Sequence, residues 1–208
     1  GNNLNVSLVL AFTLLFLFNI RNLLSVFPSL AKCIYRWKEN VNLENSMQLV
    51  RDRNIIAAVL VVPFCLLADR YSLYTPDFLG LQPEGTRVLG VIGVVIAFLI
   101  LRKLLNMAIH PGRAREVTLS ASYSCGHNYF ILGTVLFFPS AWIMALFDAG
   151  DARIRGVLLV EAALMYLLFL IRKGQIMNSF CNPFATFLYL CMLEILPAAM
   201  LVASAVLL

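Results

Sequence analysis

The sequence predicts an all-α fold, an integral membrane helical bundle with about six transmembrane helices, some of them kinked by proline. The composition is the first reason: 61% of the 208 residues are hydrophobic and 13% are charged, whereas soluble domains average about 45–50% and about 25%. The second is a mean hydropathy of +0.86, carried by long apolar blocks. These values exclude an ordinary soluble domain and a disordered chain, so we expect residues 1–208 to form a single transmembrane domain.

Six apolar blocks are candidates for the spans. A spanning helix needs about 20 mostly apolar residues, because the hydrocarbon core is about 30 Å thick and each residue rises about 1.5 Å. The blocks run over about 4–20, 54–68, 88–101, 129–147, 156–171 and 184–208. The shorter blocks should extend into their charged flanks, where Lys and Arg side chains can reach the interface. Pro63, Pro139 and Pro197 lie inside the second, fourth and sixth blocks.

The distribution of basic residues predicts the orientation. The connections after the first, third and fifth blocks contain twelve of the 16 Lys and Arg residues, and the other two connections contain four. Cytoplasmic loops carry the excess of positive charge. The face with twelve basic residues is therefore predicted to be cytoplasmic, and both termini of this chain lie on the outer face. Topology explains the net charge of +5, so we expect the lipid bilayer and no nucleic acid as a partner.

Residues 22–46 carry an apolar pattern of their own. Leucine, phenylalanine, isoleucine, tryptophan and valine recur at three- and four-residue steps, with basic residues between them: Leu24, Phe27, Leu30, Ile34, Trp37 and Val41. This spacing favours an amphipathic segment in the cytoplasmic interface, which Pro28 would start or break. An extension of the first spanning helix into the cytoplasm explains the pattern equally well.

Motifs of soluble enzymes are absent, so we predict a non-enzymatic protein with no catalytic residues and no cofactor. The chain has no Walker loop, HExxH, GxSxG or GxGxxG motif. Its five cysteines include no CxxC pair, and its only histidines are His110 and His127. A zinc site needs three or four ligands. The spacing of these residues predicts no metal site.

The strongest candidate for a functional residue is Glu194, in the sixth block. It lies about ten residues into the span, or about 15 Å deep. A carboxylate at that depth must face the bundle interior or a cavity, find a partner, or be protonated. Pro197 has no backbone N–H, so the carbonyl of Leu193 loses its helical partner. Such a kink can build a proton or cation site. A protonated Glu194 that only fixes helix packing is an alternative, as is a partner-binding or catalytic role.

A second carboxylate, Glu161, lies about five residues inside the fifth block. At about 1.5 Å per residue it sits about 7–8 Å below the outer boundary. We expect a structural role, in which Glu161 reaches the outer interface or pairs with Arg153 or Arg155 in the preceding loop. A functional intramembrane role is the alternative.

The last block resembles the ending of an uncharacterised polytopic inner-membrane family of Bacteroidota, which is known only as a domain of unknown function. The likeness rests on the stretch FLYLCMLEILPAAML at 187–201, with a Leu-Tyr-Leu-Cys-x-x-Glu-Ile-Leu-Pro motif. The fourth block is similar to that family through Asn128, Gly133, Leu136 and Pro139, although Tyr129 stands where a basic residue is expected. The resemblance implies a multi-pass protein of the bacterial inner membrane, in which the termini of this chain would be periplasmic by the charge distribution above. It implies no activity.

Two functions remain open on the sequence. The first is an accessory or assembly subunit of a membrane protein complex, which packs against other integral membrane proteins or against itself. Small residues spaced four apart, at Gly93 and Ala97 and at Ala199 and Ala203, allow such close packing. The second is a small proton-coupled transporter or permease that uses Glu194 next to the Pro197 kink. The two functions can be distinguished by the surroundings of Glu194, which could be a wet cavity, a protein partner or the bundle core.

Overall fold

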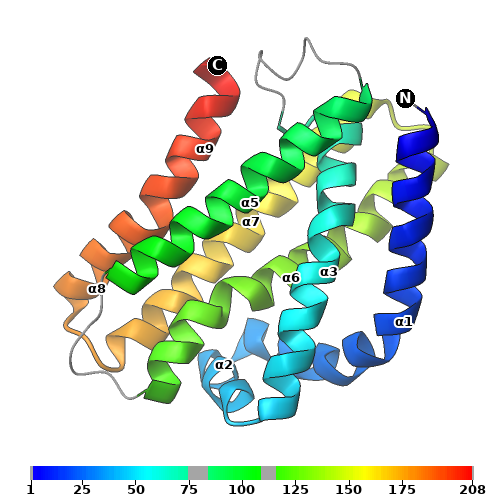
Figure 1. Ribbon diagram of the computed structural model, residues 1–208. Coiled ribbons are helices and arrows are strands. Elements are labelled where there is room, and N and C mark those ends of the chain that lie inside the picture. Colours follow the sequence, from blue (N-terminus) through cyan, green and yellow to red (C-terminus); the bar gives the residue numbers. More distant parts are fainter. Residues whose placement is uncertain (1, 75–83, 109–115, 208) are drawn as a thin grey trace.

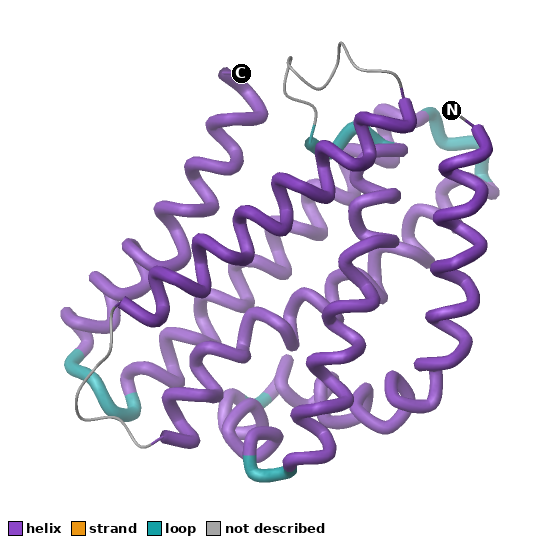
Figure 2. Tube along the Cα trace, in the orientation of Figure 1, coloured by secondary structure: helices purple, strands orange, loops and turns teal. Residues whose placement is uncertain are grey.

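The protein is described here by a computed structural model that covers residues 2–74, 84–108 and 116–207. Side chains are described for residues 17, 19–74, 87–105 and 117–204. Within these ranges the chain is almost entirely helical and contains no strand (Figure 2). The predicted all-α class is therefore confirmed.

The helices follow one another with short connections. In order they are α1 (Asn2–Tyr35), α2 (Trp37–Glu44), α3 (Met47–Arg70), α5 (Glu84–Ala108), α6 (Glu116–Leu146), α7 (Asp151–Asn178), α8 (Pro183–Leu190), the π-helix η1 (Cys191–Ile195) and α9 (Leu196–Leu207). The first turn of α1 and the last turn of α9 lie at one end of the molecule, and α2 lies at the opposite end (Figure 1). We call the end that carries α2 the α2 end.

Four helical stretches are long and apolar enough to cross a membrane. They are Arg87–Leu105, Val117–Leu146, Asp151–Asn178 and Pro183–Ser204, and they contain or overlap the third to sixth predicted blocks. The fourth begins well before the predicted position 129. Residues 117–128 are mostly small or polar and read as a loop, but hydrogen bonds from Ser120 and Asn128 to α2 satisfy this part of α6.

The other two predicted spans are not long and apolar enough to cross a membrane within the described residues. The second, 54–68, lies within α3, but charged residues at both ends of that helix leave too short an uncharged run: Arg51, Asp52, Arg53, Asp69 and Arg70. Most of the first, 4–20, falls in the part of α1 whose side chains lie outside the description. The count of six spans and the proline kinks therefore stay predictions.

The segment at 22–46 divides between the two alternatives. Residues up to Tyr35 continue α1 without a break, and Pro28 lies inside that helix instead of starting or ending one. The backbone becomes extended at Arg36, with φ −131° and ψ 116°, and the short α2 follows. The first half is thus a helical extension. The second half is a separate helix that packs against α6 and α1.

Apolar side chains from α1, α3 and α6 form the largest buried cluster near the α2 end. Its members include Val26 and Leu30 of α1, Ile56 and Leu60 of α3, and Ile131 and Leu132 of α6. Helices α6 and α7 also pack along each other, as do α1 and α3. Helix α5 packs mainly against α3 and also contacts η1. Together these contacts hold α5, α6 and α7, the helices that carry the polar groups described below.

Candidate functional site: a buried ionic cluster around Glu194

Glu194 lies in a local departure from α-helical geometry. The five residues Cys191–Ile195 form the π-helix η1, and the Leu196 N–H donates to the carbonyl of Cys191, five residues back. Pro197 follows as the second residue of α9 and has no N–H to donate. Single π-turns of this kind are rare and occur often at functional sites. The Tyr166 hydroxyl of α7 donates to the Glu194 carbonyl at 3.1 Å, so α7 supports the irregular backbone.

The Glu194 carboxylate is buried and ion-paired with two cations. Its side chain is 3% exposed. Oε1 accepts hydrogen bonds from Arg102 of α5, at 3.3 Å from Nε and 3.0 Å from Nη2, and from Nζ of Lys173 of α7. From the sequence, we expect this carboxylate to face the interior or a cavity, to find a partner or to be protonated. In the structure it has charged partners on two other helices. We call Arg102, Glu194 and Lys173 the ionic cluster.

Two further residues shape the ionic cluster. The ring of Phe169 lies close to both cations, with its centroid 5.2 Å from Cζ of Arg102 and 6.0 Å from Nζ of Lys173, distances at which a ring attracts a cation. Gly126 of α6 provides space for the arginine, because a Cβ there would lie 2.8 Å from Arg102 Cζ. The guanidinium therefore rests against the backbone of α6.

By sequence, Arg102 and Lys173 count among the basic residues of the connections, next to short apolar blocks that are expected to extend into their charged flanks. The structure has this extension. Helix α5 continues to Ala108 and α7 to Asn178, so the two cations lie about 9 Å and about 7–8 Å inside their helices. The apolar runs end before the helices do. The sequence did contain a signal for this pairing. A basic residue lies just past an apolar run, and a carboxylate without an evident partner lies inside another apolar run.

Glu161 does not belong to the ionic cluster. It is twelve residues before Lys173 on α7, about 18 Å along the helix. Its Oε1 accepts a hydrogen bond from the Ser140 hydroxyl of α6 at 2.7 Å. The expected pairing with Arg153 or Arg155 is not found among the described residues; both arginines are exposed. Glu161 Oε2 is buried and has no hydrogen-bond partner, so this carboxylate joins α6 to α7 through one oxygen.

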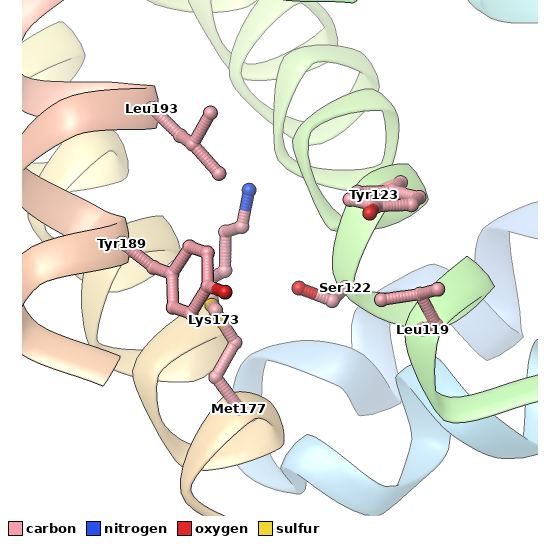
Figure 3. A pocket seen from close by; sticks show the side chains of 7 residues that line it. All are labelled: Leu119, Ser122, Tyr123, Lys173, Met177, Tyr189 and Leu193. Carbon is pink, nitrogen blue, oxygen red and sulfur yellow. The ribbon is translucent and has the colours of Figure 1, made fainter. Parts of the chain in front are cut away.

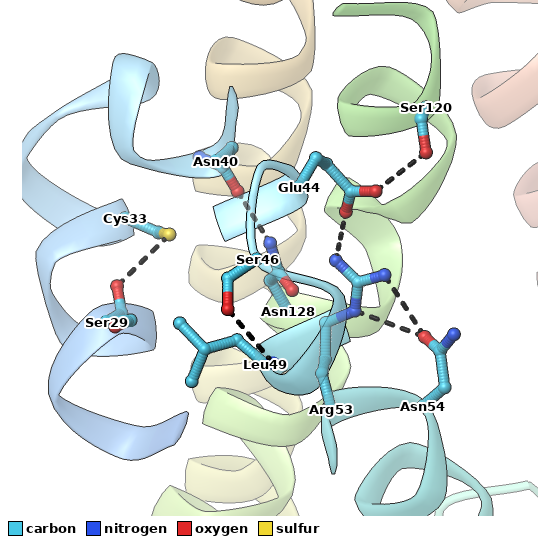
Figure 4. Close-up of polar contacts among 10 residues, drawn as sticks. All are labelled: Ser29, Cys33, Asn40, Glu44, Ser46, Leu49, Arg53, Asn54, Ser120 and Asn128. Carbon is cyan, nitrogen blue, oxygen red and sulfur yellow. Dashed lines mark hydrogen bonds and ion pairs between the residues drawn. The ribbon is translucent and has the colours of Figure 1, made fainter. Parts of the chain in front are cut away.

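A second polar network, not predicted from the sequence, joins α2, α3 and α6 (Figure 4). Glu44 is ion-paired with the buried Arg53 and accepts from Ser120 at 2.7 Å. Arg53 also donates to Asn54 at 3.1 and 3.2 Å. Asn128 donates to Asn40 at 2.8 Å. These contacts explain why α2 packs on the bundle although it is short and mostly polar.

Arg172, next to Lys173 on α7, binds the end of α1. Its guanidinium donates to the carbonyl of Ile34 at 2.7 and 3.1 Å and to that of Tyr35 at 3.2 Å. The last carbonyls of a helix have no partners inside the helix, and a cation there also complements the helix dipole. Arg172 therefore closes α1 before the chain turns into α2.

A small and a larger cavity adjoin the ionic cluster in the described part of the chain. The small one, of about 10 Å³, lies where Lys173 extends between Tyr189, Leu193 and Ser122 (Figure 3), and this is about the volume needed for one water molecule. The larger one has a volume of about 420 Å³ and lies between α3, α5 and α6, with Arg102 and His127 in its wall. Glu194 itself does not line either cavity.

The described residues hold no group of three His, Cys, Asp or Glu side chains that could bind a metal ion. His127 lines the larger cavity but is not part of such a group among the described residues. His110 lies outside the described residues. The five cysteines are free thiols.

Four long apolar helices around buried ionic groups are typical of a helical membrane protein. Comparison with protein-family models, with curated proteins and with solved structures finds no match to this chain.

Proposed function

We propose that the chain is a non-enzymatic six-span protein of the bacterial inner membrane, and that it serves as an accessory or assembly subunit of a membrane protein complex. The observation that carries the proposal is the ionic cluster. One carboxylate is held by cations from two other helices, with all three side chains at most 15% exposed. Such a contact fastens α5, α7 and η1 together, as suits a rigid scaffold.

The outer surface supports a partner-binding role. No atom lies within 4 Å of the position that a Cβ at Gly93 would take, and Ala97, one turn further on α5, is exposed. Ala199 and Ala203 are exposed on α9 as well. Small residues four apart let another helix approach closely. The outward face of α5 could therefore accept a helix of a partner or of a second copy.

The arrangement of the helices is compatible with both termini on the periplasmic side. The start of α1 and the end of α9 lie at the end of the molecule opposite α2 (Figure 1). The basic residues Arg53, Arg102 and Lys173 are on the segments that approach the α2 end. With the positive-inside rule, the α2 end faces the cytoplasm in the proposed topology.

The test is capture of the tagged, full chain in mild detergent, with bound proteins identified by mass spectrometry. We compare wild type with Gly93→Leu and with the control Gly156→Leu, which places the same side chain at another exposed helical glycine with open space around it. We expect a stoichiometric membrane partner with wild type and the control, and its loss with Gly93→Leu. Wild-type protein that is recovered alone and monodisperse would contradict the proposal.

The second candidate is a small proton-coupled transporter or permease. The π-turn at Glu194 with Pro197 behind it favours this candidate. The two cations on Oε1 weigh against it, because a proton carrier must release its proton and charge in turn. Proton flux into liposomes that contain the purified protein tests it. Flux that Glu194→Gln abolishes would make the transporter the better account.

A further inference from the structure

We propose that the larger cavity binds one anionic phospholipid, with the lipid phosphate at Arg102 and one acyl chain between α3, α5 and α6. This inference rests on the membrane placement in the proposed function and does not depend on the accessory role. The occupant is argued from the polarity of the cavity wall, from the charges around it and from its position along the helices.

The cavity is polar at one end and apolar along the rest. Its volume of about 420 Å³ is within the range of about 300–1,000 Å³ for small-molecule sites. The polar side chains in the described wall are Asn54, Arg102 and His127. The apolar part of the wall comes from Val61 and Phe64 of α3, Val95 and Phe98 of α5, Phe130 of α6, and Leu201 of α9.

Helix direction places the three polar residues together. Helices α3 and α6 run away from the α2 end, whereas α5 runs toward it (Figure 1). Asn54 and His127 precede the apolar wall residues of α3 and α6, and Arg102 follows those of α5. All three therefore lie toward the α2 end. The apolar wall extends about 10–15 Å from them, at about 1.5 Å per residue, which suits a hydrocarbon chain.

The charge at the polar end is positive. In the part of the chain with described side chains, Arg53 is balanced by Glu44, but Arg102 and Lys173 share the single carboxylate of Glu194. Counted at their formal charges, these groups leave one positive charge over. Arg102 is the member of the ionic cluster in the cavity wall and the most exposed of the three, at 15%. Its fork of N–H donors suits a phosphate group.

Position selects a phospholipid among anionic amphiphiles. Arg102 lies one residue beyond the apolar block 88–101, in the part of α5 that approaches the α2 end (Figure 1), which is the cytoplasmic side of the proposed topology. Basic pockets between helices on that side are known to bind anionic head groups. A free phosphate ion would leave the apolar wall empty. A lipid fills both parts of the cavity.

The test uses the full chain, reconstituted in vesicles of phosphatidylglycerol, of phosphatidylcholine, or of phosphatidylcholine with oleate. Bound lipid is then counted by native mass spectrometry after transfer to detergent. Two variants remove the site in different ways. Arg102→Gln removes the head-group contact and leaves Lys173 to pair with Glu194. Ala58→Trp fills the cavity from its wall and leaves every charge in place. Lys103→Gln is the matched control, because it removes an exposed neighbouring charge outside the wall.

We expect wild type and Lys103→Gln to retain one phosphatidylglycerol per chain. Arg102→Gln should lose about tenfold or more in affinity, as for a charge-assisted hydrogen bond. Ala58→Trp should lose the lipid because the indole ring takes its place in the cavity. Equal retention of phosphatidylcholine, preference for oleate, or equal loss in Lys103→Gln would overturn the proposal. Size-exclusion profiles identify a variant that fails to fold, and the other variant then decides. Partner capture with Ala58→Trp separates this result from the accessory role, since the proposal predicts that capture is unchanged.

Discussion

The guanidinium of Arg102 lies against Gly126, so closely that a Cβ at position 126 would be 2.8 Å from Arg102 Cζ. Because Gly126 has no side chain, the guanidinium of Arg102 can lie against α6 at the position where it pairs with Glu194. Together with the ion pair between Arg102 and Glu194, this contact connects α6, α5 and η1, and it leads to the first prediction.

Gly126→Ala is expected to displace Arg102 from Glu194. The added methyl group overlaps the guanidinium, and overpacking of this kind costs about 1–3 kcal/mol. The measurement is the midpoint of thermal unfolding in detergent, which should lie below that of the control. Gly93→Ala is the control, because nothing lies within 4 Å of its Cβ position and alanine favours a helix over glycine. If the two variants unfold at the same temperature, the contact between Gly126 and Arg102 has no energetic role.

The three members of the ionic cluster should differ in how much each contributes to stability. Glu194→Gln leaves two buried cations without a carboxylate, and loss of one partner from a buried pair costs about 3–5 kcal/mol. Arg102→Gln leaves the balanced pair of Lys173 and Glu194, so its effect should be clearly smaller. Adding Lys173→Met to Glu194→Gln should restore part of the loss. The measurement is thermal unfolding of the four proteins, and an equal loss for the first two variants would contradict this account of the cluster.

Arg172→Gln should loosen the end of α1. The arginine supplies hydrogen bonds to the carbonyls of Ile34 and Tyr35, and hydrogen bonds to charged groups contribute about 1.5–3 kcal/mol. Without them, the junction at Arg36 should open more often and become a better substrate for trypsin. Limited proteolysis with mass mapping of the fragments measures this. Unchanged cleavage after Arg36 would show that Arg172 does not stabilise the junction.

Cys33 should resist alkylation over the whole range in which the protein stays folded. Its thiol is fully buried and donates to the Ser29 carbonyl at 3.3 Å. Burial, with Glu39 nearby and partly opposed by Arg53, raises the pKa of this thiol to about 12. The thiolate is the reactive form, so a higher pKa means slower reaction at a given pH.

Maleimide labelling of single-cysteine variants from pH 7 to 9 checks this expectation. Burial also raises the pKa of the partly exposed Cys181 thiol, so Cys181 should label slowly near neutral pH and faster as the pH rises. Cys33 should label only after denaturation. Rapid labelling of Cys33 at pH 7 in folded protein would contradict the position of α1 against α6.

Much of the helical architecture follows from apolar runs alone. The blocks at 88–101 and 156–171 each lie within one helix, because a continuous apolar run of that length has few other stable forms in a bilayer. The start of α6 was missed, since residues 117–128 are stabilised by hydrogen bonds to α2 that no local pattern encodes. The break at Arg36, which separates α2 from α1 within the predicted amphipathic segment, was not predicted.

The candidate site was only half predictable. Glu194 is conspicuous, because a carboxylate inside an apolar run must be satisfied. Its partners Arg102 and Lys173 are not conspicuous, since basic residues at the ends of apolar runs also serve as topology signals. Which of the many such cations meets Glu194 depends on the packing of α5 and α7 against η1. Gly126 could not be singled out without that packing.

The charge state of Glu194 separates a fastening role from proton transport. An infrared difference spectrum between wild type and Glu194→Gln at neutral pH reports it. The ionic cluster predicts bands of an ionised carboxylate, unchanged as the pH is varied around neutrality. A carbonyl band of a protonated carboxylic acid, or one that appears and disappears within that range, would contradict the fastening role and favour the proton-coupled transporter.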